Sequence, residues 1–209
     1  MGRETLYVAN LADETDEATI RETFSEYGDV TAIATTHNER FDVQALLVTM
    51  NAEKSATRAN STLNGMEING KRLAVSYPDV DMDAVERGLS KKARQTAESV
   101  CKTLNEVYRK PVRRIHSMVL LCGHSFVNAL LEEAQALHAG EGMLTLDGTR
   151  KRSVGGVFFQ LALPRMSPPI YQIVHPKGGK LPNYEKTDDR AIYHLIVNPH
   201  RFDVEETVG

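Results

Sequence analysis

A basic triplet followed by two glycines is the part of this sequence best suited to bind a charged ligand. Arg150, Lys151 and Arg152 stand just before Gly155 and Gly156, and an apolar run follows at once. Arginine can form paired hydrogen bonds to a phosphate group, and lysine supplies a point charge. Adjacent glycines that open a helix leave backbone N–H groups uncovered. The segment predicts a phosphate-binding turn, with a solvated basic turn and tight helix packing as the alternatives.

Three more residues are candidates for the same surface: Phe159, Arg113 and Arg114. Phe158 and Phe159 are adjacent, so they cannot share one face of a helix. We expect Phe158 in the core, and Phe159 as either a partly exposed stacking ring or peripheral packing. Arg113 and Arg114 could extend the positive surface, although a solvated helix face is the simpler interpretation.

The sequence offers no candidate catalytic or metal site. Cys122 and His124 supply at most two ligands, and no second pair lies at zinc spacing. The glycines at 155–156 and 178–179 do not complete a phosphate-binding P-loop. No Ser-His-Asp triad or carboxylate pair can be argued. We therefore predict a non-enzymatic protein without a cofactor or metal.

Length and charge indicate two compact units with an unequal charge distribution. The chain has 209 residues, 41% of them hydrophobic, and a net charge of −3. Residues 1–78 have a net charge of −5, residues 79–165 of +3 and residues 166–209 of −1. The two cysteines, the lack of a secretory leader and the lack of a long apolar stretch predict a reducing compartment, nuclear and/or cytoplasmic, and no membrane. The middle of the chain is the better partner for an anion.

Strand and helix signals alternate in the order βαββαβ over the first 78 residues. Thr15 can cap a helix that runs to Tyr27, and a second helix starts at Asn51 and ends at Asn64-Gly65. Asn69-Gly70 is a hairpin signal. The expected strands are Thr5–Asn10, Val30–Thr36, Asp42–Met50 and Arg72–Ser76.

This segment resembles an RNA recognition motif (RRM). The resemblance lies in LYVANL at Leu6–Leu11, in Tyr27-Gly28-Asp29-Val30 and in Leu63-Asn64-Gly65. In the family, bases stack on aromatic rings of the two central strands. Tyr7 keeps the first ring, but Ala45 and Leu47 stand where the family usually has the other two.

The outward face of this sheet allows two interpretations. If Leu46, Val48 and Met50 point to the helices, their neighbours in the strand point outward together with Tyr7. One interpretation is residual RNA contact through Tyr7, Phe41 and Tyr77. The other is that a protein segment covers this apolar face.

The remaining chain predicts an all-helical unit and a partly ordered tail. An Asp83…Glu86 cap opens an amphipathic helix that continues to Tyr108. Further helices are expected from Pro111 to Gly123, over Ser125–His138 and from Gly155. Residues 166–209 contain apolar segments that we expect to dock on one of the two units.

The helical unit resembles the RNA-binding domain of the PHAX family, the phosphorylated adapter for RNA export, over about residues 97–164. The matching stretch runs from Asp147 to Phe159 and contains the basic triplet and Gly-Gly-Val-Phe. The resemblance implies a helical module for single-stranded RNA; in the adapter it helps to hold capped small nuclear RNAs for nuclear export. The adapter's other parts have no match here, so the resemblance covers its RNA-binding domain alone.

Together these observations predict an α+β chain: an RRM-like βαββαβ domain (1–78), a PHAX-like helical domain (79–165) and a docked tail (166–209). The expected partner is single-stranded or structured small RNA, with a role in small nuclear RNA handling, processing or export. The expected RNA-binding residues are Tyr7, Phe41, Tyr77, Arg113, Arg114, Arg150, Lys151, Arg152, Gly155, Gly156 and Phe159. The alternative is an interaction subunit of a ribonucleoprotein particle, whose RRM-like sheet face binds protein.

Overall fold

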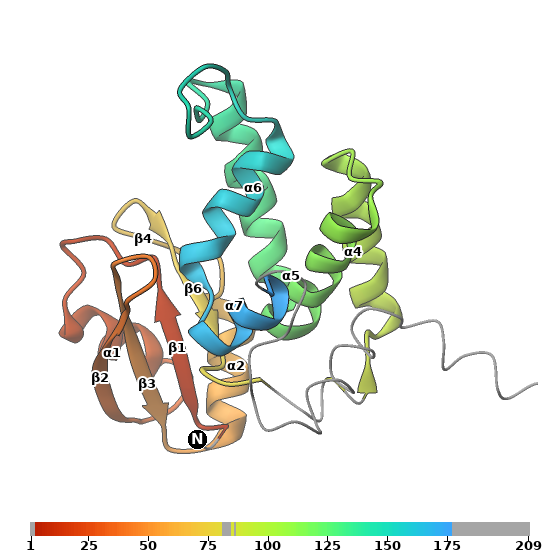
Figure 1. Ribbon diagram of the computed structural model, residues 1–209. Helices are drawn as coiled ribbons and strands as arrows, with labels where there is room; N and C mark the ends of the chain where they lie inside the picture. The colour runs from red at the N-terminus through yellow and green to blue at the C-terminus, as the bar shows by residue number, and fades with distance from the viewer. Residues whose placement is uncertain (1–2, 81–84, 86, 177–209) are drawn as a thin grey trace, which may run out of the picture.

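The computed structural model describes residues 3–80, 85 and 87–176, which form a sheet unit and a helical unit packed together (Figure 1). The four-stranded antiparallel sheet has the order β2-β3-β1-β6, and β4 and β5 form a separate hairpin. This confirms the predicted α+β class. The elements of the sheet unit are β1 (Thr5–Ala9), α1 (Glu17–Ser25), β2 (Val30–Asn38), β3 (Val43–Met50), α2 (Glu53–Leu63), β4 (Glu67–Ile68), β5 (Lys71–Arg72) and β6 (Ala74–Ser76).

Local signals place the turns of the sheet unit, with one correction. Asn69 and Gly70 have φ values of 49° and 75°, so the predicted hairpin turn between β4 and β5 is confirmed. The cap of α1 is Asp16 and not Thr15, because the Asp16 carboxylate accepts the N–H of Thr19 at 2.8 Å.

The two faces of the sheet belong to two different apolar clusters. Val48 and Met50 pack with Ile20 and Phe24 of α1, as the strand alternation predicts. On the other face, the buried side chains of the sheet pack into the cluster formed by the helical unit. These outward residues are Tyr7, Ala9, Ala45 and Ala74, all at most 2% exposed. The interpretation that protein covers this face is therefore confirmed within the chain itself.

The helical unit consists of α4 (Lys91–Thr103), α5 (Arg109–Ala139), α6 (Val154–Ala162), the 3₁₀ turn η1 (Leu163–Arg165) and α7 (Pro168–Val174). The predicted cap at Asp83 and Glu86 lies outside the described residues. A helix continuous to Tyr108 is wrong: α4 is capped by Ser90, whose hydroxyl accepts the N–H of Ala93 at 3.2 Å, and it ends at Thr103.

Helix α5 is bent at Gly123, where φ is 87° and ψ is 164°. This confirms the predicted stop at Gly123 and the new start near Ser125. By length and composition alone α5 could span a membrane, which the sequence analysis did not anticipate. However, half of its apolar window is buried inside the protein and the bend divides it, which is typical of a core helix.

Polar contacts fix the sheet unit on the helical unit. The buried Asn64 amide donates to the carbonyl of Cys122 at 3.1 Å, and its oxygen accepts the N–H of Val75 at 3.1 Å. The bend at Gly123 ends a helical segment, and the last carbonyls of such a segment lack partners within the helix. Asn64 supplies one. Gly65 lies close to α5 as well, since a Cβ atom there would come within 2.8 Å of the Ala129 methyl group.

The predicted division of the chain at residues 78 and 165 stays a prediction. Met166, Ile170 and Tyr171 lie after the second boundary, yet they belong to the same buried cluster as α5 and the outward face of the sheet. The predicted tail therefore contributes the helix α7 to the core.

Candidate nucleic-acid interface

The basic triplet lies on a short hairpin between α5 and α6. Its two sides are joined by backbone hydrogen bonds, from Arg152 N–H to the Met143 carbonyl at 2.7 Å and from Thr145 N–H to the Arg150 carbonyl at 2.9 Å. At the tip, the Asp147 carboxylate accepts hydrogen bonds from the hydroxyls of Thr145 and Thr149, which lower its pKa. The hairpin is thus held in one shape although it is exposed.

The three cations of this hairpin are not equally available. The Arg152 Nε donates to the Leu144 carbonyl at 2.9 Å, and the Lys151 ammonium lies 3.5 Å from the Gly140 carbonyl. The Arg150 side chain is exposed and makes no hydrogen bond with any described residue. Within the described part of the chain, none of the three forms an ion pair. Leu146 at the tip is 99% exposed, so an apolar side chain accompanies the charges.

The start of α6 is already faced by a carboxylate. Ser153 caps the helix by accepting the N–H of Gly156 at 3.1 Å. A Cβ atom on the buried Gly155 would lie 2.5 Å from Oε1 of Glu106. Gly155 therefore permits close packing, as one sequence interpretation held. An anionic ligand bound at this helix start would have to displace Glu106, because like charges repel.

The position of Glu106 follows from the way α4 ends. Asn105 has a φ of 54°, and the N–H groups of Asn105 and Glu106 donate to the carbonyls of Lys102 and Cys101. This pair of bonds is a Schellman motif, which turns the chain sharply after a helix. The chain then leaves Val107 and Tyr108 76% exposed each.

The three aromatic residues expected on the RRM-like sheet do not share one open face. Tyr7 is 2% exposed beneath the helical unit, so the prediction that a base stacks on it is wrong for this structure. Tyr77 packs against the cluster on the α1/α2 side of the sheet, with the Arg3 guanidinium 5.1 Å from its ring. Phe41 is half-buried and meets the Tyr171 ring edge-on at 5.2 Å.

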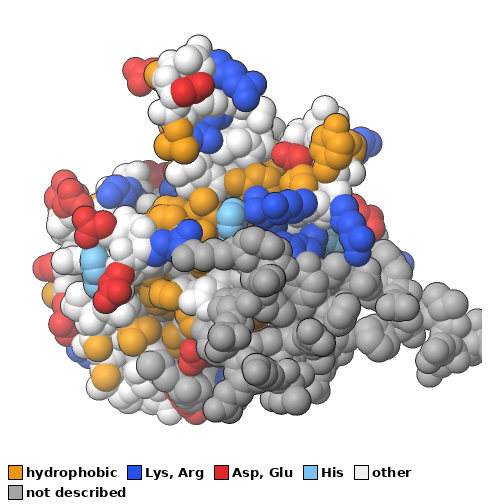
Figure 2. Space-filling view, in the orientation of Figure 1, with side chains coloured by type: hydrophobic (Ala, Val, Ile, Leu, Met, Phe, Trp, Pro, Cys, Tyr) orange, Lys and Arg blue, Asp and Glu red, His pale blue; other side chains and the backbone are white. Residues whose placement is uncertain are grey.

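A second group of cations and rings lies where the β2–β3 loop meets α5 and α7. The Arg40 guanidinium lies 4.7 Å from the centre of the Tyr171 ring, and the His175 imidazole is stacked on the same ring at 5.6 Å. Arg114 lies 5.9 Å from the ring of Phe159. Figure 2 shows Lys, Arg and His side chains gathered across the middle of this face, beside hydrophobic ones and apart from the protruding hairpin.

We refer to Arg40, Lys110, Arg114, Tyr171 and His175 as the junction cluster. Of these five residues, the sequence analysis predicted only Arg114 as an RNA-binding residue. It also predicted Arg113 and Phe159, which are neighbours of Arg114. Arg40 and Tyr171 are 131 positions apart, so no local pattern could bring them together. The pKa of His175 is lowered by burial and by the positive charges of Arg114, Arg40 and Lys110. Burial and the neighbouring Arg113 lower the pKa of Arg114.

The lowered pKa of His175 predicts a loss of stability in mild acid. Between its folded pKa and about 6.5, the unfolded chain binds more protons at this residue, so the free energy of unfolding falls as the pH falls. We expect His175→Gln to flatten the decrease in melting temperature between neutral and mildly acidic pH. Equal slopes for the wild-type protein and His175→Gln would contradict this assignment.

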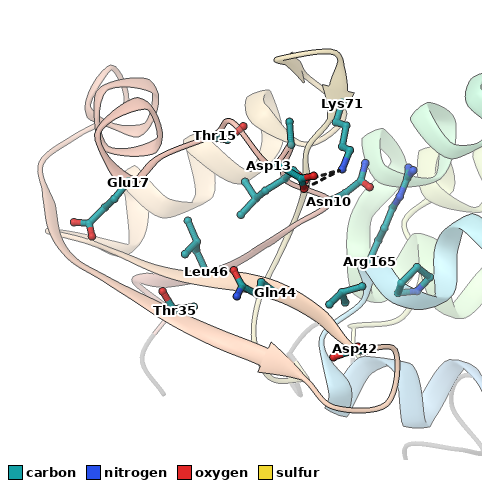
Figure 3. A pocket seen from close by; sticks show the side chains of 14 residues that line it. Asn10, Asp13, Thr15, Glu17, Thr35, Asp42, Gln44, Leu46, Lys71 and Arg165 are labelled. Carbon is teal, nitrogen blue, oxygen red and sulfur yellow. Dashed lines mark hydrogen bonds and ion pairs between the residues drawn. The ribbon is translucent and has the colours of Figure 1, made fainter.

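An open pocket of about 510 Å³ lies between the loop after β1, the strands β2 and β3, and η1 (Figure 3). The exposed carboxylates of Asp13, Glu17 and Asp42 line it. Its two cations are engaged: Lys71 lies 4.0 Å from Asp13, and Arg165 is paired with Glu133. The pocket is therefore unsuited to a phosphate.

No metal site is evident among residues 3–80, 85 and 87–176, because no three His, Cys, Asp or Glu side chains gather there. Cys101 and Cys122 are buried free thiols, and burial raises the pKa of Cys101 to about 11. Neither thiol is suited to nucleophilic chemistry.

Comparison with solved structures finds RNA recognition motifs. The Sex-lethal RNA recognition domains 1 and 2 from Drosophila melanogaster are 21% identical, with a TM-score of 0.33, over 39% of this chain and 52% of that one. This chain thus spans about half the length of that protein. Two structures of the Mip6 RRM3 domain are 20% identical, each with a TM-score of 0.33, over 36% and 35% of this chain and 92% and 90% of theirs. No curated protein matches the sequence.

Two family models match the chain in succession. Residues 6–74 match the RNA recognition motif, and residues 96–175 match the RNA-binding domain of the phosphorylated adapter RNA export protein. The second match includes the basic hairpin, α6 and α7. The chain is therefore an RNA-binding protein that carries an RNA recognition motif followed by a PHAX-type RNA-binding domain.

Proposed function

We propose that this protein binds single-stranded RNA mainly through its helical unit, at the hairpin that carries Arg150 and Lys151. The burial of Tyr7 and the rest of the outward sheet face carries this proposal, because RRM domains stack bases on that face. Arg152 supports this hairpin by donating to the Leu144 carbonyl, and Gly155 lets α6 start close to Glu106. Since both matched families are non-catalytic, we propose no enzymatic activity.

We further propose small nuclear RNA as the class of ligand, since the second match is to a domain of an RNA export adapter. Such a role would place the protein in the nucleus and/or the cytoplasm. The alternative, a sheet face that recruits another protein, is less favoured because the chain's own helical unit occupies this face. An external protein partner would have to use another surface.

Replacing Arg150 and Lys151 with alanine tests the hairpin. Two exposed cations in contact with phosphates are together worth about 1.4 kcal/mol, so we expect roughly tenfold weaker binding of a single-stranded RNA. The slope of log affinity against log salt should also decrease by about 1.4, because fewer counterions are released. Fluorescence anisotropy over a series of salt concentrations measures both.

The matched control replaces Lys54 and Arg58 with alanine. Both side chains are exposed on α2 of the sheet unit, so this variant also loses two positive charges. This variant should bind RNA almost as tightly as the wild-type protein. If both double variants lose the same affinity, only the net charge matters and the hairpin is no specific site.

A further inference from the structure

Three cations converge on one imidazole in the junction cluster. Arg40 comes from the β2–β3 loop, Lys110 and Arg114 from α5, and His175 follows α7. All three cations lower the pKa of His175, and they belong to two units of the fold. The rings of Tyr171 and His175 are stacked, and the Arg40 guanidinium lies 4.7 Å from the centre of the Tyr171 ring. These contacts hold Arg40, from the sheet unit, next to His175.

No carboxylate neutralises these cations within the described part of the chain. Arg40, Lys110 and Arg114 form no ion pair there, and no acidic residue contributes to the lowered pKa values of Arg114 and His175. The Nε atom of Arg114 is buried without a hydrogen-bond partner. Arg114, Arg40 and Lys110 all lower the pKa of His175, which shows that positive potential is concentrated here, and a bound anion would relieve the repulsion.

We propose that the junction cluster is a second RNA contact, which binds an internal phosphate of the strand. This proposal rests on the proposed RNA-binding function. Arg114 and Arg40 can each present two N–H groups to phosphate oxygens, and Lys110 adds a point charge. The half-buried Phe159 beside Arg114 offers a ring for an adjacent base.

This second contact exists only while the sheet unit and the helical unit are packed together. Arg40 belongs to the sheet unit, whose overall charge is negative, and it reaches the basic side of α5 only because α7 lies against the sheet face. The RRM-like unit would thus contribute to RNA binding from the edge of its sheet. An acidic protein segment is the competing ligand, and it is favoured if the intact chain binds no RNA.

Three double variants that each remove one arginine and one lysine provide the test. They are Arg40→Ala with Lys110→Ala at the junction, Arg150→Ala with Lys151→Ala at the hairpin, and Arg58→Ala with Lys54→Ala as the control. Binding of a single-stranded RNA with a 5′-hydroxyl end is measured at several salt concentrations, so any loss reports internal phosphates. We expect roughly tenfold weaker binding for the junction variant, a salt slope smaller by about 1.4 and little change for the control.

The outcomes separate this inference from the proposed function. If the junction variant binds as tightly as the control while the hairpin variant is weakened, the second contact is refuted and the proposed function stands. If only the junction variant is weakened, the junction is supported and the hairpin assignment fails. If the wild-type chain binds no RNA, both fail and an acidic protein becomes the ligand to seek. Arg40→Lys, which keeps the charge, should retain most of the affinity.

Discussion

Replacing Arg165 with methionine should lower the free energy of unfolding by about 3–5 kcal/mol, because it leaves a carboxylate without its partner inside the protein. The Arg165 side chain forms two bonds of 2.7 Å with the two carboxylate oxygens of Glu133. Only 8% of the Arg165 side chain and 26% of the Glu133 side chain are exposed. The pair ties η1, between α6 and α7, to α5. Urea unfolding of the two proteins measures the difference.

Two further variants isolate the contribution of the pair itself. Adding Glu133→Leu to Arg165→Met removes both charges, and we expect this double variant to recover much of the lost stability. Arg21→Met removes a partly exposed arginine that is 2.9 Å from Glu17 and also donates to the Val30 carbonyl at 3.1 Å, and it should cost about 1 kcal/mol. If the variants at Arg165 and Arg21 are equally stable, burial does not strengthen the Arg165 pair.

Replacing Asn64 with alanine should lower the free energy of unfolding by about 3 kcal/mol, because it strands two buried backbone groups. These groups are the carbonyl of Cys122 at the bend of α5 and the N–H of Val75 in β6. Their loss weakens the sheet unit and its contact with α5 at once. RNA binding by the junction cluster should therefore decrease as well, although Asn64 itself is buried and is not proposed to touch RNA.

The thiol of Cys122 reports this opening directly. It is buried beside the bend, and burial raises its pKa, so it reacts with a thiol reagent only when the structure opens. A loss of about 3 kcal/mol corresponds to roughly a hundredfold faster labelling, measured by mass spectrometry. Asn51→Ala, which removes an exposed amide bonded to Asp29, should label at nearly the wild-type rate. Unchanged labelling in Asn64→Ala would refute the role of this contact.

Local patterns in the sequence predicted most of the sheet unit. The alternation of Leu46, Val48 and Met50 fixed which face meets the helices, since side chains alternate along a strand. Ala45 and Leu47 replaced the usual aromatic residues, and this loss was a correct signal that protein covers the outward face. Gly123 likewise marked the bend in α5.

Contacts between distant segments could not be predicted in this way. The junction cluster joins residues near 40, 110 and 175, and only the packing of α7 against the sheet face brings them together. The contact between Glu106 and Gly155 could not be predicted either, because it depends on the turn that follows α4. The basic hairpin was visible because its charges are consecutive. Its role as an RNA site remains a prediction.

The single apolar cluster that joins Tyr7 and Ala45 to α5 and α7 has a consequence for dissecting the protein. Cutting the chain after residue 78 would give one fragment with an exposed apolar sheet face and another with exposed apolar helix faces. Each would tend to self-associate, and neither would report how the intact chain behaves. Deletion mapping with such halves would therefore understate RNA affinity, and point substitutions in the whole chain are the sounder route.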